Sequence, residues 1–345
     1  MKHLITGGSG FIGNLVAREL LKRGDRVHCV DIWEDPSRPK AIEFTKTSVL
    51  DRASVRSTLK KVDVVHHNAA LVAQCDAGDE FWNVNVEGTR VVIDEAIRAK
   101  VGAIIHTSST SVYGLPPHDG SPITKNTPTK PIEPYGRSKL AGEKLAEELC
   151  ADAGVPLITI RPRSTLGAGR LGIYQILFEW ISENRNVYTI GDGSNIMQFI
   201  HAHDLMSLYM LALNSGKTGT YNVGTDEFST LKTDLESLVE HAGSSSKVKT
   251  LPKGVTNIAL ELLWKMKLSP LSPYHYLTYH TSCYFDIQPC LELGWKPEYS
   301  NIAMLKESYD WFLKIKNNDQ AIKSLRSPHR APLQQKILKI LKRFS

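Results

Sequence analysis

Hydrophobic residues follow two different periods in the first half of the chain. Short runs of β-branched and other apolar residues predict strands, and longer segments with an apolar residue every three to four positions predict helices. Strands are expected at residues 3–6, 26–31, 62–68, 103–108 and 157–161. Helices are expected between them at residues 11–23, 53–59, 81–100 and 136–153. This alternation is typical of a doubly wound parallel sheet, so we expect an α/β fold over residues 1–165.

The second half has a mixed pattern. It predicts helices at residues 173–184, 204–213, 232–241 and 255–267, a strand at 220–223, and a stretch rich in proline and tyrosine at 269–284. A long proline-rich loop at 115–134 precedes it. We interpret residues 166–315 as mainly a smaller substrate-binding lobe, with some segments returning to the sheet, and residues 316–345 as a tail.

Glycines cluster directly after the first predicted strand. The segment Thr6-Gly7-Gly8-Ser9-Gly10-Phe11-Ile12-Gly13 satisfies both G-x-G-x-x-G and G-x-x-G-x-x-G. Glycine permits the tight turn, the approach of backbone to a pyrophosphate and close packing of helix on strand, while the helix N-terminus favours an anion. The position between strand and helix therefore predicts a Rossmann-type dinucleotide site.

An acidic residue ends the second predicted strand. Asp31 stands 18 residues after Gly13, close to the spacing expected for a carboxylate that binds the adenosine ribose hydroxyls. Such a carboxylate repels a 2′-phosphate, and no arginine follows within the next few positions to receive one. The sequence therefore favours NAD over NADP.

A tyrosine and a lysine stand four residues apart at the start of the helix predicted at 136–153. The spacing places Tyr135 and Lys139 on one face of the helix. A free phenol has a pKa of about 10, and a neighbouring cation favours its ionised form. A hydroxyl-rich segment from Thr107 to Ser111 follows an earlier strand and offers a hydrogen-bond donor for a substrate oxygen. These residues predict transfer of a proton and a hydride at an alcohol carbon.

These motifs together resemble the extended short-chain dehydrogenases/reductases of the NAD-dependent epimerase/dehydratase group. The matching segments stand in the family's order over roughly residues 1–315. They are Thr6–Gly13, Asp31, Asp51, Asn68-Ala69-Ala70, Asn85–Thr89, Ser108–Gly114, Tyr135–Lys139, Arg161-Pro162, Phe199–Leu205 and Leu293–Pro297.

The resemblance implies a role for each matching position. Tyr135 would be the general base and acid, Lys139 its electrostatic partner and a ribose contact, and Ser109 the hydroxyl that contacts the substrate. Asp51 would lie on the adenine side. The remaining cofactor-binding positions would be Gly7, Gly10, Phe11, Ile12, Gly13, Asp31, Ala69 and Ala70. The resemblance also implies a homodimer, the form in which members of this family commonly occur.

The sequence departs from the family at positions that distinguish one type of reaction from another. Dehydratases carry Asp-Glu where this chain has Thr110-Ser111, which disfavours dehydration. Epimerases that act on UDP-sugars carry an arginine before the Phe-Ile-His segment, where this chain has Met197-Gln198. They carry a second arginine at a position upstream of Asp286, and this chain lacks that arginine as well. Residues that could replace these cations are Arg163, Arg170, Lys217 and His280.

Three functions therefore stay open. The first is a nucleotide-sugar (4-)epimerase or ketoreductase, and the second an NAD-dependent 3β-hydroxysteroid-type or other alcohol dehydrogenase, which the tyrosine-rich stretch would suit. The third is a non-catalytic NAD-binding protein, which the presence of Ser109, Tyr135 and Lys139 disfavours.

Charge is concentrated at the C-terminal end. The net charge is +6, yet residues 320–345 carry seven basic and no acidic side chains, which leaves the first 319 residues at −1. A near-neutral body argues against a nucleic-acid enzyme. In the tail, apolar residues between 333 and 344 would share one helical face opposite lysines, which predicts an amphipathic helix for an anionic membrane surface, a partner or a second subunit.

The remaining composition suggests a cytoplasmic protein. The five cysteines form no C-x-x-C pair, so we expect reduced thiols and no metal site. The N-terminus shows no signal-peptide pattern, and no run of about 18 apolar residues predicts a transmembrane helix.

Overall fold

The computed structural model describes residues 1–73, 77–170, 172–266, 268–269, 271–316 and 318. Within these ranges seven strands form one parallel sheet in the order β10-β6-β5-β4-β1-β2-β3. The strands are β1 (Lys2–Thr6), β2 (Arg26–Asp31), β3 (Glu43–Lys46), β4 (Val64–His67), β5 (Ala103–Thr107), β6 (Leu157–Pro162) and β10 (Gly219–Val223). The order reverses at β1, as in the predicted doubly wound Rossmann-type fold.

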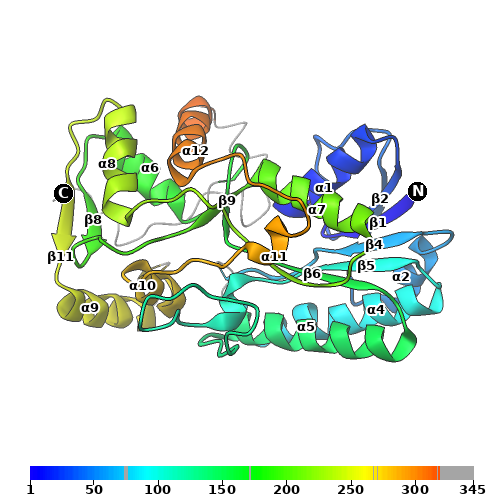
Figure 1. The fold of residues 1–345 in the computed structure, drawn as a ribbon. Coiled ribbons are helices and arrows are strands. Elements are labelled where there is room, and N and C mark those ends of the chain that lie inside the picture. Colours follow the sequence, from blue (N-terminus) through cyan, green and yellow to red (C-terminus); the bar gives the residue numbers. More distant parts are fainter. Residues whose placement is uncertain (74–76, 171, 267, 270, 317, 319–345) are drawn as a thin grey trace.

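Helices cover both faces of the sheet (Figure 1). On one face lie α1 (Phe11–Lys22) and α7 (Ala202–Ser215), whose apolar residues share a core with Ile5 and Val27. On the other lie α2 (Arg52–Thr58), α4 (Gly88–Arg98) and α5 (Pro134–Ala153), packed around Leu4 and Val65. Because both faces are covered, the central strands β1, β4 and β5 are buried along nearly their whole length.

The helix predicted at residues 81–100 is broken into three parts. A short α3 (Glu80–Trp82) leads into a π-helical turn, Asn83–Glu87, before α4 begins. The side chain of Asn85 in this turn bonds the backbone of Leu71, accepting from its N–H at 2.8 Å and donating to its carbonyl at 3.1 Å. Such turns are common at functional sites because they redirect a side chain that a regular helix would place elsewhere.

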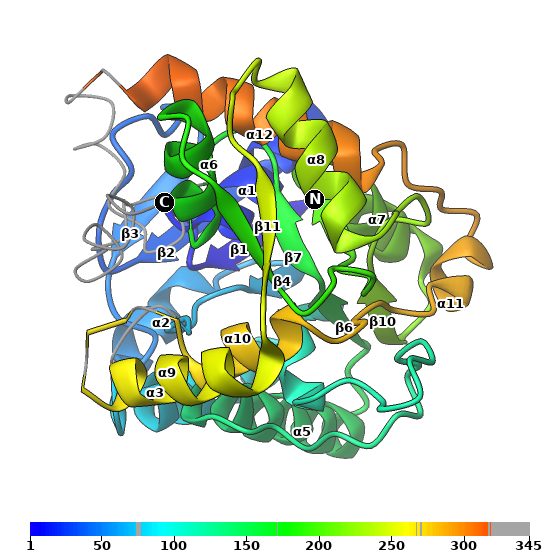
Figure 2. The ribbon, with the colours of Figure 1, turned by 90° about the vertical axis from the view of Figure 1, so that its left-hand side faces the viewer.

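The second half builds a smaller lobe at one end of the sheet and also returns to the sheet. The lobe has its own apolar core, with Phe178, Leu238 and Phe312 among its members. Its elements are β7 (Ser164–Leu166), α6 (Tyr174–Ser182), β8 (Val187–Ile190), β9 (Phe199–His201), α8 (Leu231–His241), β11 (Val248–Leu251), α9 (Lys253–Lys265), α10 (Pro273–Tyr279) and α12 (Asn301–Lys316). The short helix α11 (Gln288–Leu291) packs against β10 of the sheet. Figure 2 shows β11 and α9 on the side of the lobe that faces away from the sheet.

Short and polar elements differ most from the prediction. The strands β3, β8, β9 and β11 and the helix α12 were not expected from the pattern, and α10 lies within the proline- and tyrosine-rich stretch. Helix α10 forms there because Pro273 occupies its first turn and Ser272 and His275 make a capping box. The predicted amphipathic helix at residues 333–344 lies outside the described residues.

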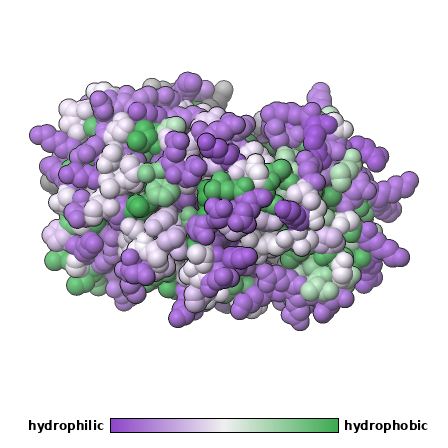
Figure 3. Space-filling model, in the orientation of Figure 1, coloured by the Kyte–Doolittle hydropathy of each residue, from purple (hydrophilic) through white to green (hydrophobic). Residues whose placement is uncertain are grey.

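The surface bears hydrophilic residues over most of the face shown in Figure 3, with hydrophobic residues near the middle and at the lower left. None of the helices in the described ranges is long and apolar enough to cross a bilayer.

Candidate functional site

A cavity of about 350 Å³ lies where the loops after the strands meet the smaller lobe. Its walls come from the glycine-rich loop, from the ends of β2, β4, β5 and β6, from the start of α5, and from segments around Arg170 and Tyr274. Open α/β sheets bind ligands outside the carboxyl ends of their strands, and the cavity occupies this position.

The glycine-rich loop fits an anion that approaches its backbone. Gly7 has φ +68°, and a Cβ on it would lie 2.8 Å from the backbone nitrogen of Ala69. A Cβ on Gly13 would lie 2.2 Å from the carbonyl oxygen of Gly7, so neither position tolerates a side chain. Gly10 precedes α1 without a side-chain cap. The N-terminus of α1 therefore borders the cavity with Gly7, Gly10, Phe11, Ile12 and Gly13 in its lining.

Asp31 lines the cavity at the end of β2. Its carboxylate accepts hydrogen bonds from the backbone N–H of Ser9 at 3.0 Å and of Ile32 at 2.7 Å. Burial raises the pKa of this carboxyl above its ordinary value, and the backbone donors counteract that rise. The two bonds fix the carboxylate beside the glycine-rich loop, where ribose hydroxyls would be expected.

Asp51 does not line this cavity. Its exposed carboxylate accepts from the backbone N–H of Ser54 at 3.0 Å and from the Ser54 hydroxyl at 2.7 Å, and so caps α2. Thr47, Ser48 and Val49 line the cavity from the preceding segment instead. The adenine contact at Asp51 stays a prediction, whereas Ala69 and Ala70 do border the cavity.

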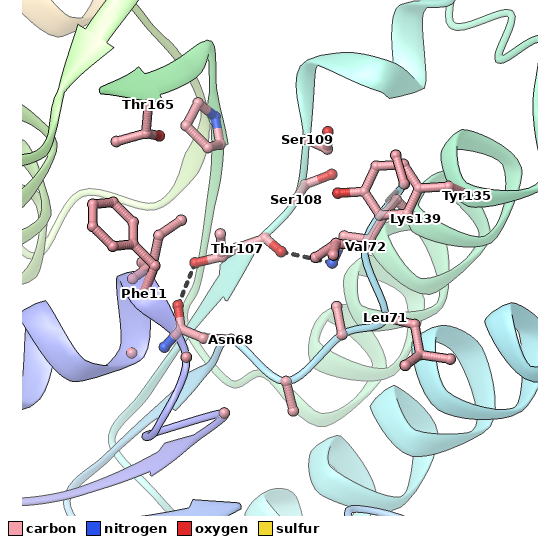
Figure 4. Close-up of a pocket in the computed structure, with 18 of the residues that line it drawn as sticks. Phe11, Asn68, Leu71, Val72, Thr107, Ser108, Ser109, Tyr135, Lys139 and Thr165 are labelled. Carbon is pink, nitrogen blue, oxygen red and sulfur yellow. Dashed lines mark hydrogen bonds between the residues drawn. The ribbon is translucent and has the colours of Figure 1, made fainter. Parts of the chain in front are cut away.

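Tyr135 and Lys139 lie one turn apart at the start of α5 and both line the cavity (Figure 4). The Lys139 ammonium is buried and donates to the carbonyl oxygen of Thr107 at 2.7 Å. Burial lowers the pKa of Lys139 to about 8. The structure thus brings the predicted pair to the end of β5, as a helix face with this spacing should.

Two serine hydroxyls border the same space. The Ser109 oxygen accepts from the backbone N–H of Ser111 at 3.1 Å, which leaves its hydroxyl hydrogen available to donate. The Ser108 hydroxyl is buried with no hydrogen-bond partner, which makes it a second candidate for a substrate contact. The sequence contained Ser108 within the matched segment but offered nothing to separate its role from that of Ser109.

Asn85 positions the start of α5 rather than lining the cavity. Besides its bonds to Leu71, its amide donates to the Ser138 hydroxyl at 3.0 Å, and that hydroxyl donates to the carbonyl of Tyr135 at 2.8 Å. The π-helical turn is therefore tied directly to the backbone of Tyr135.

Two arginines line the cavity, Arg163 and Arg170, and both were among the possible replacements for the missing cations. Arg163 is held inside the protein by the carbonyl of Gln198 at 3.1 Å and by the hydroxyl of Thr110 at 2.8 Å. The Arg170 guanidinium lies 5.6 Å from the centre of the Phe11 ring, and its Nε is buried without a hydrogen-bond partner. Within the described ranges no carboxylate pairs with Arg170.

The segments that lack the family's arginines, Met197-Gln198 and residues 280–285, do not line the cavity. The Gln198 side chain is fully buried, where it donates to the carbonyl of Thr225 at 2.7 Å and accepts from the backbone of Phe285 at 2.8 Å. Of the four replacements considered, Arg163 and Arg170 line the cavity, whereas Lys217 and His280 do not.

Comparisons with known proteins agree with this geometry. A protein of Sinorhizobium fredii, named only as uncharacterized, is 39% identical over 98% of this chain and 85% of its own length. A UDP-glucose 4-epimerase of Drosophila melanogaster is 26% identical over 89% of this chain and 95% of its own length. Among solved structures, a UDP-glucuronic acid 4-epimerase from Bacillus cereus in complex with NAD has a TM-score of 0.75 at 21% identity, with 91% and 99% of the two chains covered. At that identity the likeness concerns the fold.

The family model described as "NAD dependent epimerase/dehydratase family" matches residues 3–224. This range contains the glycine-rich loop, Asp31, Ser109, Tyr135 and Lys139, together with the last strand of the sheet. The chain therefore belongs to the NAD-dependent epimerase/dehydratase family.

Proposed function

We propose that the chain is an NAD-dependent epimerase that inverts a secondary alcohol carbon of a nucleotide sugar. The observation that carries this proposal is the cavity that joins a dinucleotide loop, the Ser109, Tyr135 and Lys139 trio and Arg170, which no carboxylate in the described part of the chain pairs with. The UDP-sugar 4-epimerases among the relatives and structural neighbours support it.

The glycine-rich loop, Asp31, Ala69 and Ala70 would hold NAD, which supplies the acceptor and donor of hydride when bound. Glycine at positions 7 and 13 allows the loop to pack tightly at the N-terminus of α1, which borders the cavity where a pyrophosphate would bind. The carboxylate of Asp31, already fixed by two backbone donors, would accept from ribose hydroxyls.

Tyr135 would take the proton from the reacting hydroxyl and later return it. The buried ammonium of Lys139 favours the anionic form of that tyrosine, and Ser109 would donate to the same substrate oxygen. Arg170 would bind an anionic part of the substrate, because it lines the cavity and no carboxylate of the described residues pairs with it.

An alcohol dehydrogenase would use the same trio, so the test must separate the two reactions. Purified protein is incubated with UDP-glucose and with UDP-glucuronic acid, and the sugar is followed by NMR while NADH is followed by absorbance. An epimerase forms the C4 epimer without net NADH release. Net NADH release without an epimer would contradict the proposal, and a Tyr135→Phe variant that still binds NAD should form neither product.

A further inference from the structure

Helix α9 carries an unusual concentration of exposed apolar side chains. It contains no buried residue, although it lies in a lobe with a well-formed core. Half of the exposed large apolar side chains in the described ranges fall between residues 255 and 268. They are Val255, Ile258, Leu262, Trp264, Met266 and Leu268.

Four of these side chains form one stripe along the helix. Val255, Ile258, Leu262 and Met266 follow one another at intervals of three or four residues and are 72%, 63%, 55% and 57% exposed. The opposite side of α9 faces α10, where the Asn257 amide lies 3.0 Å from Nε2 of His280. The lower left of Figure 3, where α9 lies, shows hydrophobic residues at the surface. Contiguous exposed apolar surface of this kind marks an interaction site.

The charges in the segment that carries the stripe are almost all positive. Residues 244–269 contain five lysines at 247, 249, 253, 265 and 267 against a single acid, Glu261. Lys247, Lys249 and Lys253 are exposed, and Glu261 is already paired with Lys265 at 2.7 Å. A second copy of this face would bring like charges together, which is unfavourable, whereas an anionic surface would neutralise them.

We propose that α9 docks the enzyme on an anionic lipid surface. The apolar stripe would lie at the boundary of headgroups and acyl chains, with the flanking lysines at the lipid phosphates. A single short anchor gives only weak and reversible binding.

This position would place the lipid surface next to a wall of the cavity. Helix α10, which packs against α9, contributes Tyr274 and His275 to the cavity lining. The docked face is thus one helix away from the site, so the reaction would take place near the surface. This inference does not depend on which alcohol the enzyme acts on.

The test uses the full chain and vesicles of phosphatidylcholine, alone or with phosphatidylglycerol. We expect sedimentation with the anionic vesicles, little with the neutral ones, and weaker binding at high salt. The double variant Ile258→Ser, Leu262→Ser should reduce the partition coefficient about tenfold or more, because it removes two side chains that enter the interface. Leu313→Ser is the matched control, since Leu313 is also an exposed leucine but lies on α12.

Two outcomes would overturn the proposal. Equal sedimentation of the double variant and the wild type would assign any membrane contact to other parts of the chain. A shift of the wild type to dimers in analytical ultracentrifugation that the double variant loses, with no vesicle binding in either, would assign the stripe to self-association. Retained NAD and an unchanged circular dichroism spectrum confirm that the variants are folded.

Discussion

The side chain of Lys139 is buried, and burial disfavours the positive charge of its ammonium group. Burial lowers its pKa to about 8, and the ammonium form is the one that supports an anionic Tyr135. We therefore expect kcat to fall as the pH rises through about 8, approaching tenfold per pH unit, since deprotonation removes the positive charge. The pH–rate profile measures this limb. In Lys139→Met the residual rate should be about 100-fold lower and should lack the limb, and a limb that persists there would assign it to another group.

In the described ranges, no carboxylate forms an ion pair with Arg170. Burial lowers its pKa to about 10, so it remains a cation at neutral pH. We expect Arg170→Gln to raise KM for a nucleotide sugar about 10- to 100-fold with a much smaller change in kcat, since a charge-assisted contact to the bound substrate is lost. Steady-state kinetics measure both constants. Lys217→Gln serves as the control because Lys217 is exposed and outside the cavity lining, and an equal effect there would contradict a local role.

The residues that the sequence could predict are those fixed by local geometry. Gly13, Tyr135 and Lys139 each have a partner within one turn or one loop, so the spacing of these residues in the sequence is enough to predict their place in the site. Ser108 and Arg170 have no such local requirement. They face the cavity because distant segments close over it, which a single sequence does not show.

The junction of β1 and α1 is sensitive to the addition of a single methyl group. A Cβ on Gly13 would meet the carbonyl oxygen of Gly7 at 2.2 Å and its carbon at 2.8 Å, and backbone atoms cannot move aside cheaply. We expect Gly13→Ala to lower the free energy of unfolding by about 1–3 kcal/mol and to weaken NAD binding at least tenfold. Urea unfolding and NAD titration measure the two effects.

Gly254→Ala is the matched control for this prediction. Gly254 lies in the first turn of α9, and a Cβ there would meet nothing within 4 Å. The substitution should leave NAD binding unchanged and raise the free energy of unfolding slightly, by up to about 0.5 kcal/mol, because alanine is the better helix former. Equal losses in the two variants would contradict the steric argument.

Helices and strands were predictable where the apolar residues of their own sequence repeat with the period of a helix or a strand. The strands β1 and β2 and the helices α1 and α5 match the expected positions because they bury a continuous apolar face. The short strand β3 is partly exposed at the sheet edge and carries a glutamate and a lysine, so no apolar run marks it. The π-helical turn depends on the bonds of Asn85 to Leu71 and Ser138, which are tertiary contacts.

At the scale of the molecule, the two halves of the sequence share one sheet. Strand β10 completes the sheet beside β6, and α7 packs against α1 on the same face. The pattern predicted that some segments would return to the sheet, but pairing between residues 158–162 and 219–223 is a long-range contact that periodicity does not specify. One apolar core thus spans both halves, and we expect them to unfold together.

Four histidines are buried at the centre of this shared sheet. They are His3 on β1, His66 and His67 on β4, and His106 on β5. Burial lowers the pKa of His3 to about 4 and that of His67 to about 3, and it also lowers those of His66 and His106 well below their ordinary value. His3 and His66 share a hydrogen bond at 2.9 Å, whereas neither ring nitrogen of His106 has a partner.

These histidines should make the whole molecule sensitive to mild acid. Below a pH of about 6.5 the unfolded chain binds protons that the folded histidines do not take up, so the free energy of unfolding falls as the pH decreases, by up to about 1.4 kcal/mol per pH unit for each histidine. Urea unfolding between pH 8 and pH 5 measures this slope. Carboxylates in ion pairs, such as Glu95 with Arg56 at 2.7 Å, lose their contribution to stability only at lower pH, because Arg56 and Arg52 hold the pKa of Glu95 at about 2.

The variant His106→Leu tests the role of one of these histidines. It should reduce the slope of stability against pH by the contribution of a single histidine. It should cost little stability at pH 8, since it replaces a buried ring whose nitrogens are unpartnered with an apolar side chain. An unchanged slope in this variant would show that the acid sensitivity arises elsewhere.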